Sequence, residues 1–207
     1  MLEWADMFDA WVNGRFMAGK KNETRQGVRM EIAETDRLIL RNFRQGDAAD
    51  LFAYLRQPRS NCFASLRLAN LDAAQAEVEA RSRSDEHIAV CLRSVDRLIG
   101  DLFCVHEPPD TYSVGWNFHA DFGGAGYASE AARALFDYLF TVKRARRLYA
   151  YVEEDNLASQ RLCERLGMRR EGLFKEFVSF VTDDEGAPIF ENTMQYAILR
   201  KEWTARR

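Results

Sequence analysis

The chain has 207 residues, of which 47% are hydrophobic and 29% charged, and its formal net charge is -3. This length and apolar content suit one folded domain with a sizeable core, with room for a short extension. The balanced charge argues against a dedicated nucleic-acid binder, which usually carries a strong basic excess.

The four cysteines form no CxxC pair, and the three histidines have no partners at zinc-ligand spacing. We therefore expect free thiols and no metal site. No apolar run reaches the length of a membrane-spanning helix, and Met1–Ala10 lacks the basic start and apolar core of a signal peptide. The expected location is the cytoplasm, with no membrane partner.

Residues 1–32 differ from the rest of the chain. Trp4, Phe8 and Trp11 lie on one face of a predicted helix, and a polar, glycine-containing linker follows. This helix either docks on the domain or a second subunit, or belongs to a poorly ordered extension with Met30 as the natural start. We predict an extension over residues 1–32 and a domain over residues 33–207.

Hydrophobic spacing predicts the elements of that domain. Asp72 is the expected N-cap of its second helix, while Asn156 caps and Gly167 ends its last one. In chain order, we expect a strand at 38–43, helices at 47–55 and 71–84, strands at 87–92, 98–105 and 112–118, a helix after residue 126, a strand at 148–152, a helix over 156–167, and strands at 172–182 and 189–199. This order indicates an α/β (α+β mixed) fold, with one central sheet and helices on its faces.

A glycine-rich turn between a strand and a helix predicts an anion site. Backbone N–H groups at a helix start lack intrahelical partners, and glycines let a ligand approach the backbone closely. The turn lacks the Lys-Ser/Thr ending of a nucleoside-triphosphate loop and the third glycine of a dinucleotide fingerprint. The residues expected to hold a phosphate or pyrophosphate are Phe122, Gly123, Gly124, Ala125, Gly126, Tyr127 and Ala128.

Four segments together resemble the GNAT superfamily of N-acetyltransferases, in its RimJ/RimL-type branch. The run from Gly124 to Ala131 is similar to the pyrophosphate-binding motif of that family. The second signature is matched by Glu154-Asp155-Asn156-Leu-Ala-Ser159 together with Cys163-Glu-Arg-Leu-Gly-Met168, followed by Arg170-Glu171-Gly172. Thr35–Arg41 and Tyr196–Trp203 match near the two ends, so the resemblance covers about Ala33 to Trp203.

The resemblance implies a mostly antiparallel sheet with a V-shaped splay between two parallel strands, here 112–118 and 148–152. The pantetheine arm of acetyl-CoA would lie in the V, paired with the backbone of Trp116, Asn117 and Phe118. Asn156 and Ser159 would contact the thiol end of the cofactor. The family also implies an amine acceptor, either a protein N-terminal α-amine or a small molecule, and a homodimer is a family-level expectation.

In such a site, a neutral amine attacks the thioester carbonyl of acetyl-CoA directly, in a ternary complex. Alignment of the reactants and a backbone N–H on the 116–118 strand would lower the barrier. A base must take the amine proton, and the leaving sulfur needs a proton donor. The candidate bases are Glu171 and Glu107, with His106, His119 and Glu176 as further options, and the candidate donors are Ser159 and Cys163.

Three positions depart from the family pattern. Asp121 replaces the usual Gln or Arg, Gly123 stands where this branch often has an aromatic residue, and Cys163 replaces a frequent Tyr. These departures keep open a second hypothesis, an inactive acyl-CoA-binding sensor or interaction module. A third hypothesis is a nucleotide-binding protein that uses the same glycine loop.

Overall fold

The computed structural model describes residues 31–206. The predicted helix near the N-terminus and most of the predicted 1–32 extension lie outside the described residues. The described strands are β1 Glu31–Glu34, β2 Leu38–Arg41, β3 His87–Leu92, β4 Arg97–Glu107, β5 Thr111–Phe118, β6 Arg147–Glu153, β7 Arg169–Thr182 and β8 Pro188–Leu199. The helices are α2 Ala48–Leu55, α3 Leu71–Ser82, α4 Tyr127–Thr141, α5 Leu157–Arg165 and α6 Arg200–Thr204, with 3-10 helices η2 Gln45–Asp47, η3 Asn61–Leu66 and η4 Ala120–Phe122.

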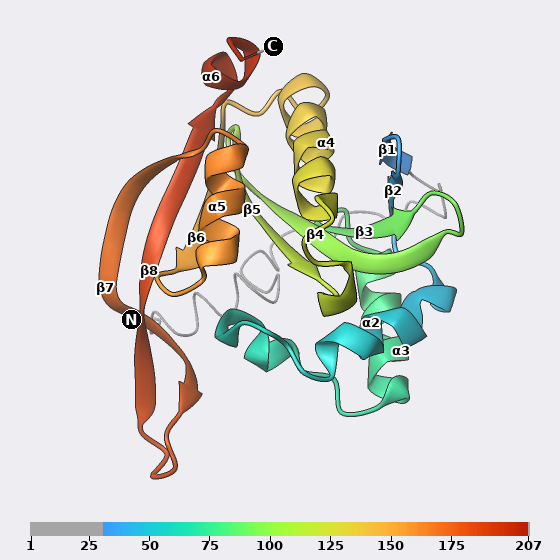
Figure 1. Cartoon of the computed structure of the whole chain (residues 1–207), viewed down its shortest axis with the longest axis vertical. Helices are drawn as coiled ribbons and strands as arrows, with labels where there is room; N and C mark the ends of the chain where they lie inside the picture. The colour runs from blue at the N-terminus through green and yellow to red at the C-terminus, as the bar shows by residue number, and fades with distance from the viewer. Residues whose placement is uncertain (1–30, 207) are drawn as a thin grey trace.

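The strands form one sheet in the order β1-β2-β3-β4-β5-β6-β8-β7. All neighbouring strands are antiparallel except β5 and β6, which are parallel. Figure 1 shows this sheet running through the molecule, with the long β7–β8 hairpin at one side. The predicted mixed fold with a mostly antiparallel sheet is confirmed.

The parallel pair separates after a short contact. Thr111, Tyr112 and Ser113 of β5 face Arg147, Leu148 and Tyr149 of β6. Beyond them, β5 stays paired with β4, and β6 stays paired with β8. The two strands therefore diverge towards Phe118 and Glu153, which forms the predicted V-shaped splay (Figure 1).

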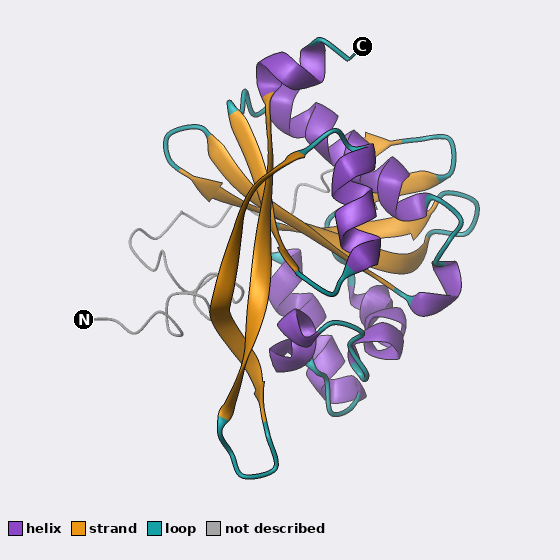
Figure 2. Ribbon diagram, turned by 60° about the vertical axis from the view of Figure 1, so that its left-hand side comes forward, coloured by secondary structure: helices purple, strands orange, loops and turns teal. Residues whose placement is uncertain are grey.

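Each face of the sheet carries its own core, because alternate residues of a strand point to opposite faces. Leu38, Leu40, Ile88 and Val90 pack in the larger core, together with the buried stripes of α4 and α5. The next residues along β3, Ala89 and Cys91, pack with α2 and α3 in a second core. Figures 1 and 2 show α4 and α5 on one side of the sheet and α2 and α3 on the other.

Several local predictions need correction. Asn70, rather than Asp72, is the N-cap of α3, because its side chain accepts a hydrogen bond from the Ala73 N–H (2.8 Å). Asp47 makes no cap hydrogen bond to α2. Its carboxylate instead forms a buried, two-pronged pair with Arg41, at 2.8 Å in each arm.

Several short elements were not predicted from the sequence. The segment before α3, for which no element is predicted, contains η3, and α6 follows β8. Strand β1 crosses the boundary predicted between residues 32 and 33. By contrast, Asn156 caps α5 as predicted, with its Oδ1 accepting from the Ser159 N–H (3.1 Å). No helix of the described part is long and apolar enough to cross a membrane.

Candidate active site

The glycine-rich loop lies just beyond β5 and opens into α4. Gly124 and Gly126 have φ angles of +78° and +83°, a region that residues with a side chain rarely adopt. Gly126 is the N-cap of α4 and offers no side chain to the first-turn N–H groups. Residues Gly123 to Gly126 are exposed, so the backbone that leads into the helix is accessible to an anionic ligand.

The turn between β1 and β2 holds this loop in place. Arg37 Nη1 donates to the Ala125 carbonyl (3.0 Å), and its guanidinium lies 4.5 Å from the centre of the Tyr127 ring. Arg37 also pairs with Glu130 in the first turn of α4 (Nη2–Oε2 2.6 Å), and Thr35 Oγ1 donates to the same carboxylate (2.5 Å). The loop is therefore fixed before any ligand arrives.

Two departures from the family pattern leave the loop intact. The Asp121 side chain is 82% exposed and lies 3.8 Å from His119 Nδ1, so it is free to stay in solvent, away from a bound phosphate. Gly123 has a φ of -67°, which any residue can adopt. A Cβ added there would meet only the Ala120 carbonyl oxygen, at 3.0 Å. Neither residue distorts the anion site.

A hydrogen-bonded chain crosses the open end of the V. Trp116 Nε1 on β5 donates to Ser159 Oγ on α5 (3.1 Å). Asn156 accepts from the Ser159 N–H, and its Nδ2 donates to Ser60 Oγ (2.9 Å) and to Glu153 Oε2 (3.2 Å). Three residues predicted at this end, Trp116, Asn156 and Ser159, are therefore brought together.

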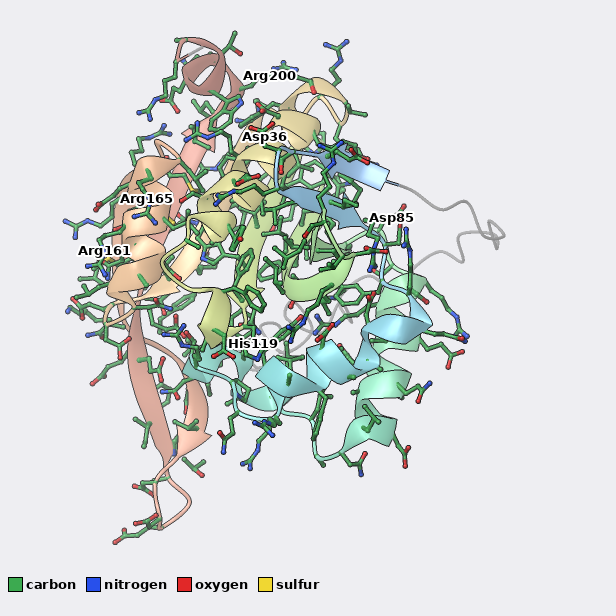
Figure 3. The ribbon with its side chains drawn as sticks, turned by 45° about the vertical axis from the view of Figure 1, so that its right-hand side comes forward. Asp36, Asp85, His119, Arg161, Arg165 and Arg200 are labelled. Atoms are coloured by element: carbon green, nitrogen blue, oxygen red, sulfur yellow. The ribbon has the colours of Figure 1, made fainter. Side chains whose placement is uncertain are left out.

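The other predicted cofactor residues lie on the diverging part of β5, in the glycine-rich loop and at the start of α4. Asn117 lies opposite Asp101 of β4, and Phe118 covers Gly100, where a Cβ would come within 2.6 Å of the ring. The Phe122 and Tyr127 rings meet edge to face, 6.4 Å apart. The Phe122 ring also contacts His119, which lies at the end of β5 in Figure 3. Ala128 is half-buried in the first turn of α4.

The structure places Glu171 far from the loop. Its carboxylate pairs with Arg147 and with Arg169 (2.5 Å), near the end of the sheet where β5 and β6 are still joined. The hydrogen bond from Arg147 holds the pKa of Glu171 below its usual range. A carboxylate held ionised by two arginines is a poor proton acceptor, so we do not assign the base to Glu171.

Glu107 also lies at the joined end. It is opposite Thr111 in the β4–β5 pair and accepts a hydrogen bond from the Tyr149 hydroxyl. Burial raises the pKa of Tyr149, and the negative charge of Glu107 raises it further. The Tyr149 hydroxyl therefore stays protonated and donates its hydrogen bond to the Glu107 carboxylate.

Cys163 is a core residue. It is fully buried on the inner face of α5, and burial raises the pKa of its thiol to about 12. It packs in the larger core with Leu162 and Leu166. Of the two predicted proton donors, Ser159 is therefore the one that lies at the open end of the V.

Sequence reasoning missed the Arg37–Glu130 tether and the buried Glu153. The Thr35–Arg41 motif was recognised, but nothing in its residue types shows that Arg37 reaches a loop 88 residues away. Glu153 was not predicted as a site residue, because an acidic residue at the end of a strand is usually a surface residue. No group of His, Cys, Asp or Glu in the described residues is arranged to hold a metal ion.

A sheet splayed between two parallel strands, with a glycine-rich loop at its open end, has a shape that suits a long phosphate-bearing ligand. The family model for the acetyltransferase (GNAT) domain matches residues 37–169. The uncharacterized N-acetyltransferase YnaD of Bacillus subtilis (strain 168) is 31% identical over 171 residues, which cover 82% of this chain and 97% of that protein. The chain therefore belongs to the GNAT family and is an N-acetyltransferase, an acyltransferase.

Solved structures agree with this assignment. A GNAT-family acetyltransferase from Bacillus anthracis is 26% identical with a TM-score of 0.72, covering 82% of this chain and 98% of that one. Two further neighbours share the fold. The ribosomal-protein-S5-alanine acetyltransferase of Vibrio fischeri has 15% identity, a TM-score of 0.64, and coverage of 86% and 99%. The spermidine/spermine N-acetyltransferase SpeG of Vibrio cholerae, in mutant forms, has 18% identity, a TM-score of 0.63, and coverage of 82% and 98%.

Proposed function

We propose that this protein transfers an acetyl group from acetyl-CoA to a primary amine, by direct attack in a ternary complex. The observation that carries the proposal is the continuity between the open V and the glycine loop. Trp116, Asn117 and Phe118 lie on the diverging part of β5, and the loop follows only a few residues later. One extended ligand can therefore contact both.

The residues of this site fit coenzyme A. The exposed backbone from Gly123 to Gly126, followed by the start of α4, suits a pyrophosphate. The edge of β5 that β6 leaves unpaired after Ser113 suits a pantetheine arm, which has amide groups to pair with it. Arg161 and Arg165 are exposed on α5 (Figure 3) and add positive charge near the loop, since Arg165 Nε donates to Ser129 Oγ on α4 (3.2 Å).

Ser159 supplies the proton donor in this proposal. Its Oγ accepts from the Trp116 indole, which orients the hydroxyl and leaves its own proton to donate into the V. A backbone N–H of the Trp116–Phe118 segment stabilises negative charge on the acetyl oxygen. Acetyl-CoA supplies the acetyl group as a thioester. The amine nitrogen forms a bond to the carbonyl carbon as the carbon–sulfur bond breaks, and the leaving sulfur takes the Ser159 proton. The proton that the amine loses passes through water and restores the Ser159 hydroxyl.

The acceptor enters from the sheet face opposite α4 and α5. On this face, the rings of Tyr149 and Tyr151 of β6 meet edge to face, with centres 5.5 Å apart, and the Phe177 ring of β7 lies 5.6 Å from Tyr151. Aromatic walls of this kind suit an amine with an apolar or cationic body. The fold neighbours that act on a ribosomal protein and on spermidine support the RimJ/RimL-type branch and name two acceptor types to test.

The experiment is a thiol-release assay with acetyl-CoA and two acceptors, spermidine and a short peptide with a free N-terminal alanine. Turnover with either amine, together with acetylated product by mass spectrometry, is the expected result. Binding of acetyl-CoA with no transfer to either acceptor or to a wider amine panel would contradict the proposal in favour of a binding module.

A further inference from the structure

Glu153, the last residue of β6, is a buried carboxylate without a positively charged partner. It is 7% exposed. Its oxygens accept from the backbone N–H of Cys62 (3.2 Å) and from Asn156 Nδ2 (3.2 Å), both neutral donors. None of the ion pairs found within residues 31–206 includes it.

This is unusual, because buried charges are normally paired. The surroundings make the local potential more negative. Burial raises the pKa of the nearby Glu191, and the negative charge of Glu153 raises it further. The Cys62 thiol shows the same two effects in the same order. A cation bound here would reduce the repulsion between the negative charges of Glu153 and Glu191 and would form an ion pair with Glu153.

A second polar group beside Glu153 lacks a partner. Thr193 of β8 lies directly opposite Glu153 in the antiparallel pair, so their side chains share one face of the sheet. Thr193 is 4% exposed, and its Oγ1 has no hydrogen-bond partner. A buried hydroxyl without a partner indicates a missing hydrogen-bonding group, since such hydroxyls are nearly always satisfied, and its oxygen lone pairs can accept from a ligand N–H.

Both groups lie next to the proposed reaction site. Glu153 accepts from Asn156, which also positions the Ser159 N–H. Glu153 belongs to the same alternate set of β6 residues as Tyr149 and Tyr151, and its contact with Cys62 places it beneath η3. It therefore faces the acceptor side, and acetyl-CoA would approach from the other side of the V.

We propose that Glu153 and Thr193 bind the ammonium group of the acceptor, with Glu191 adding negative charge at the rim. The inference rests on the proposed function and narrows it, because it selects amines that reach the site as cations. A primary ammonium has three N–H donors, which match a carboxylate oxygen and a hydroxyl oxygen and leave one for water. Through that water the nitrogen loses the proton that it must give up before it attacks the thioester as a neutral amine. Glu191 stays at the rim because Asn61 Nδ2 already donates to it (2.6 Å).

The test compares Glu153→Gln and Thr193→Val with the wild type in the thiol-release assay, using spermidine and the alanine peptide. We expect kcat/KM for the amine to fall about 30-fold in E153Q, mainly through KM, and several-fold in T193V. The Kd for acetyl-CoA, measured by calorimetry, should stay within about twofold. Glu154→Gln is the matched control, because this exposed neighbour pairs with Lys175 (3.2 Å) and should behave as the wild type.

Glu153→Asp separates charge from folding, since it keeps the carboxylate and should retain more amine affinity than E153Q. An unchanged amine KM in both E153Q and T193V would overturn the inference and leave the proposed function standing. If the wild type acetylates neither these two amines nor a wider amine panel, the proposed function fails, and binding to the CoA complex decides the inference by ligand-observed NMR. In that case, n-butylammonium should bind the wild type more tightly than n-butanol does. If E153Q prefers n-butylammonium over n-butanol as strongly as the wild type does, the inference is overturned.

Discussion

Replacing Glu130 by glutamine tests whether the glycine loop is held by the β1–β2 turn. The carboxylate accepts from Thr35 Oγ1 (2.5 Å), the Arg37 N–H (3.2 Å) and Arg37 Nε (2.7 Å). A glutamine keeps the shape but removes the charge and turns one acceptor into a donor. Hydrogen bonds to charged groups contribute more than neutral ones, but the Arg37 side chain is 47% exposed, so screening reduces the effect. We expect a loss of about 1.5 kcal/mol.

That loss corresponds to a drop in Tm of roughly 3–6 °C for a domain of this size. Urea denaturation at pH 7 measures the loss in the free energy of unfolding, and Glu79→Gln is the control. Glu79 pairs with Arg83 on an exposed face of α3, where the side chains are 60% and 73% exposed. Loss of that pair should cost less than about 0.5 kcal/mol.

The pH dependence gives an independent check on Glu130. Burial alone would raise its pKa, but the hydrogen bonds from Thr35 and Arg37 outweigh burial and leave the pKa below the usual value. A lowered folded-state pKa means that the stabilisation is complete above the unfolded pKa of about 4.3 and is lost as the pH falls through the folded value. The difference in the free energy of unfolding between wild type and E130Q should therefore stay constant from pH 7 to about pH 5 and become smaller below pH 4. Equal stability at pH 7 would refute the tether.

Three further substitutions test the site. Ser159→Ala should lower kcat about 100-fold with little change in the Kd for acetyl-CoA, measured by thiol release and calorimetry, because it removes the proton donor. An unchanged kcat would remove Ser159 from the mechanism. Glu171→Gln should leave kcat/KM within about twofold, because Glu171 is held by arginines at the joined end of the strands. A large drop in kcat/KM of E171Q would support Glu171 as the base. Asp121→Asn should leave acetyl-CoA affinity within about twofold, because its side chain is in solvent, and a large gain would show that the carboxylate repels the phosphates.

Local pattern was enough to predict the scaffold. Alternation placed β3, β5 and β6 to within one residue, and the glycine turn placed the start of α4. The V itself came from resemblance to a family, because a parallel pair that separates after three residues leaves no mark on periodicity.

Without the family resemblance, which supplied Trp116 and Ser159, the site could be predicted only where a residue acts through its own backbone or cap. Gly126 and Asn156 are of that kind, since left-handed φ and helix capping follow from residue type. Arg37, Glu153 and Thr193 act through contacts between distant segments, which a single sequence does not encode locally. The ion pairs of Glu171 could not be predicted for the same reason, because its two arginine partners come from β6 and β7.

The central claim is that the glycine loop and the open V bind acetyl-CoA. Isothermal titration of the purified protein with acetyl-CoA, with ATP and NAD as controls, tests it most directly. We expect saturable binding to acetyl-CoA alone, weakened about tenfold or more by Gly126→Asp, which strains a φ of +83° and places a carboxylate beside the phosphates. Absence of binding, or equal binding of ATP, would contradict the account.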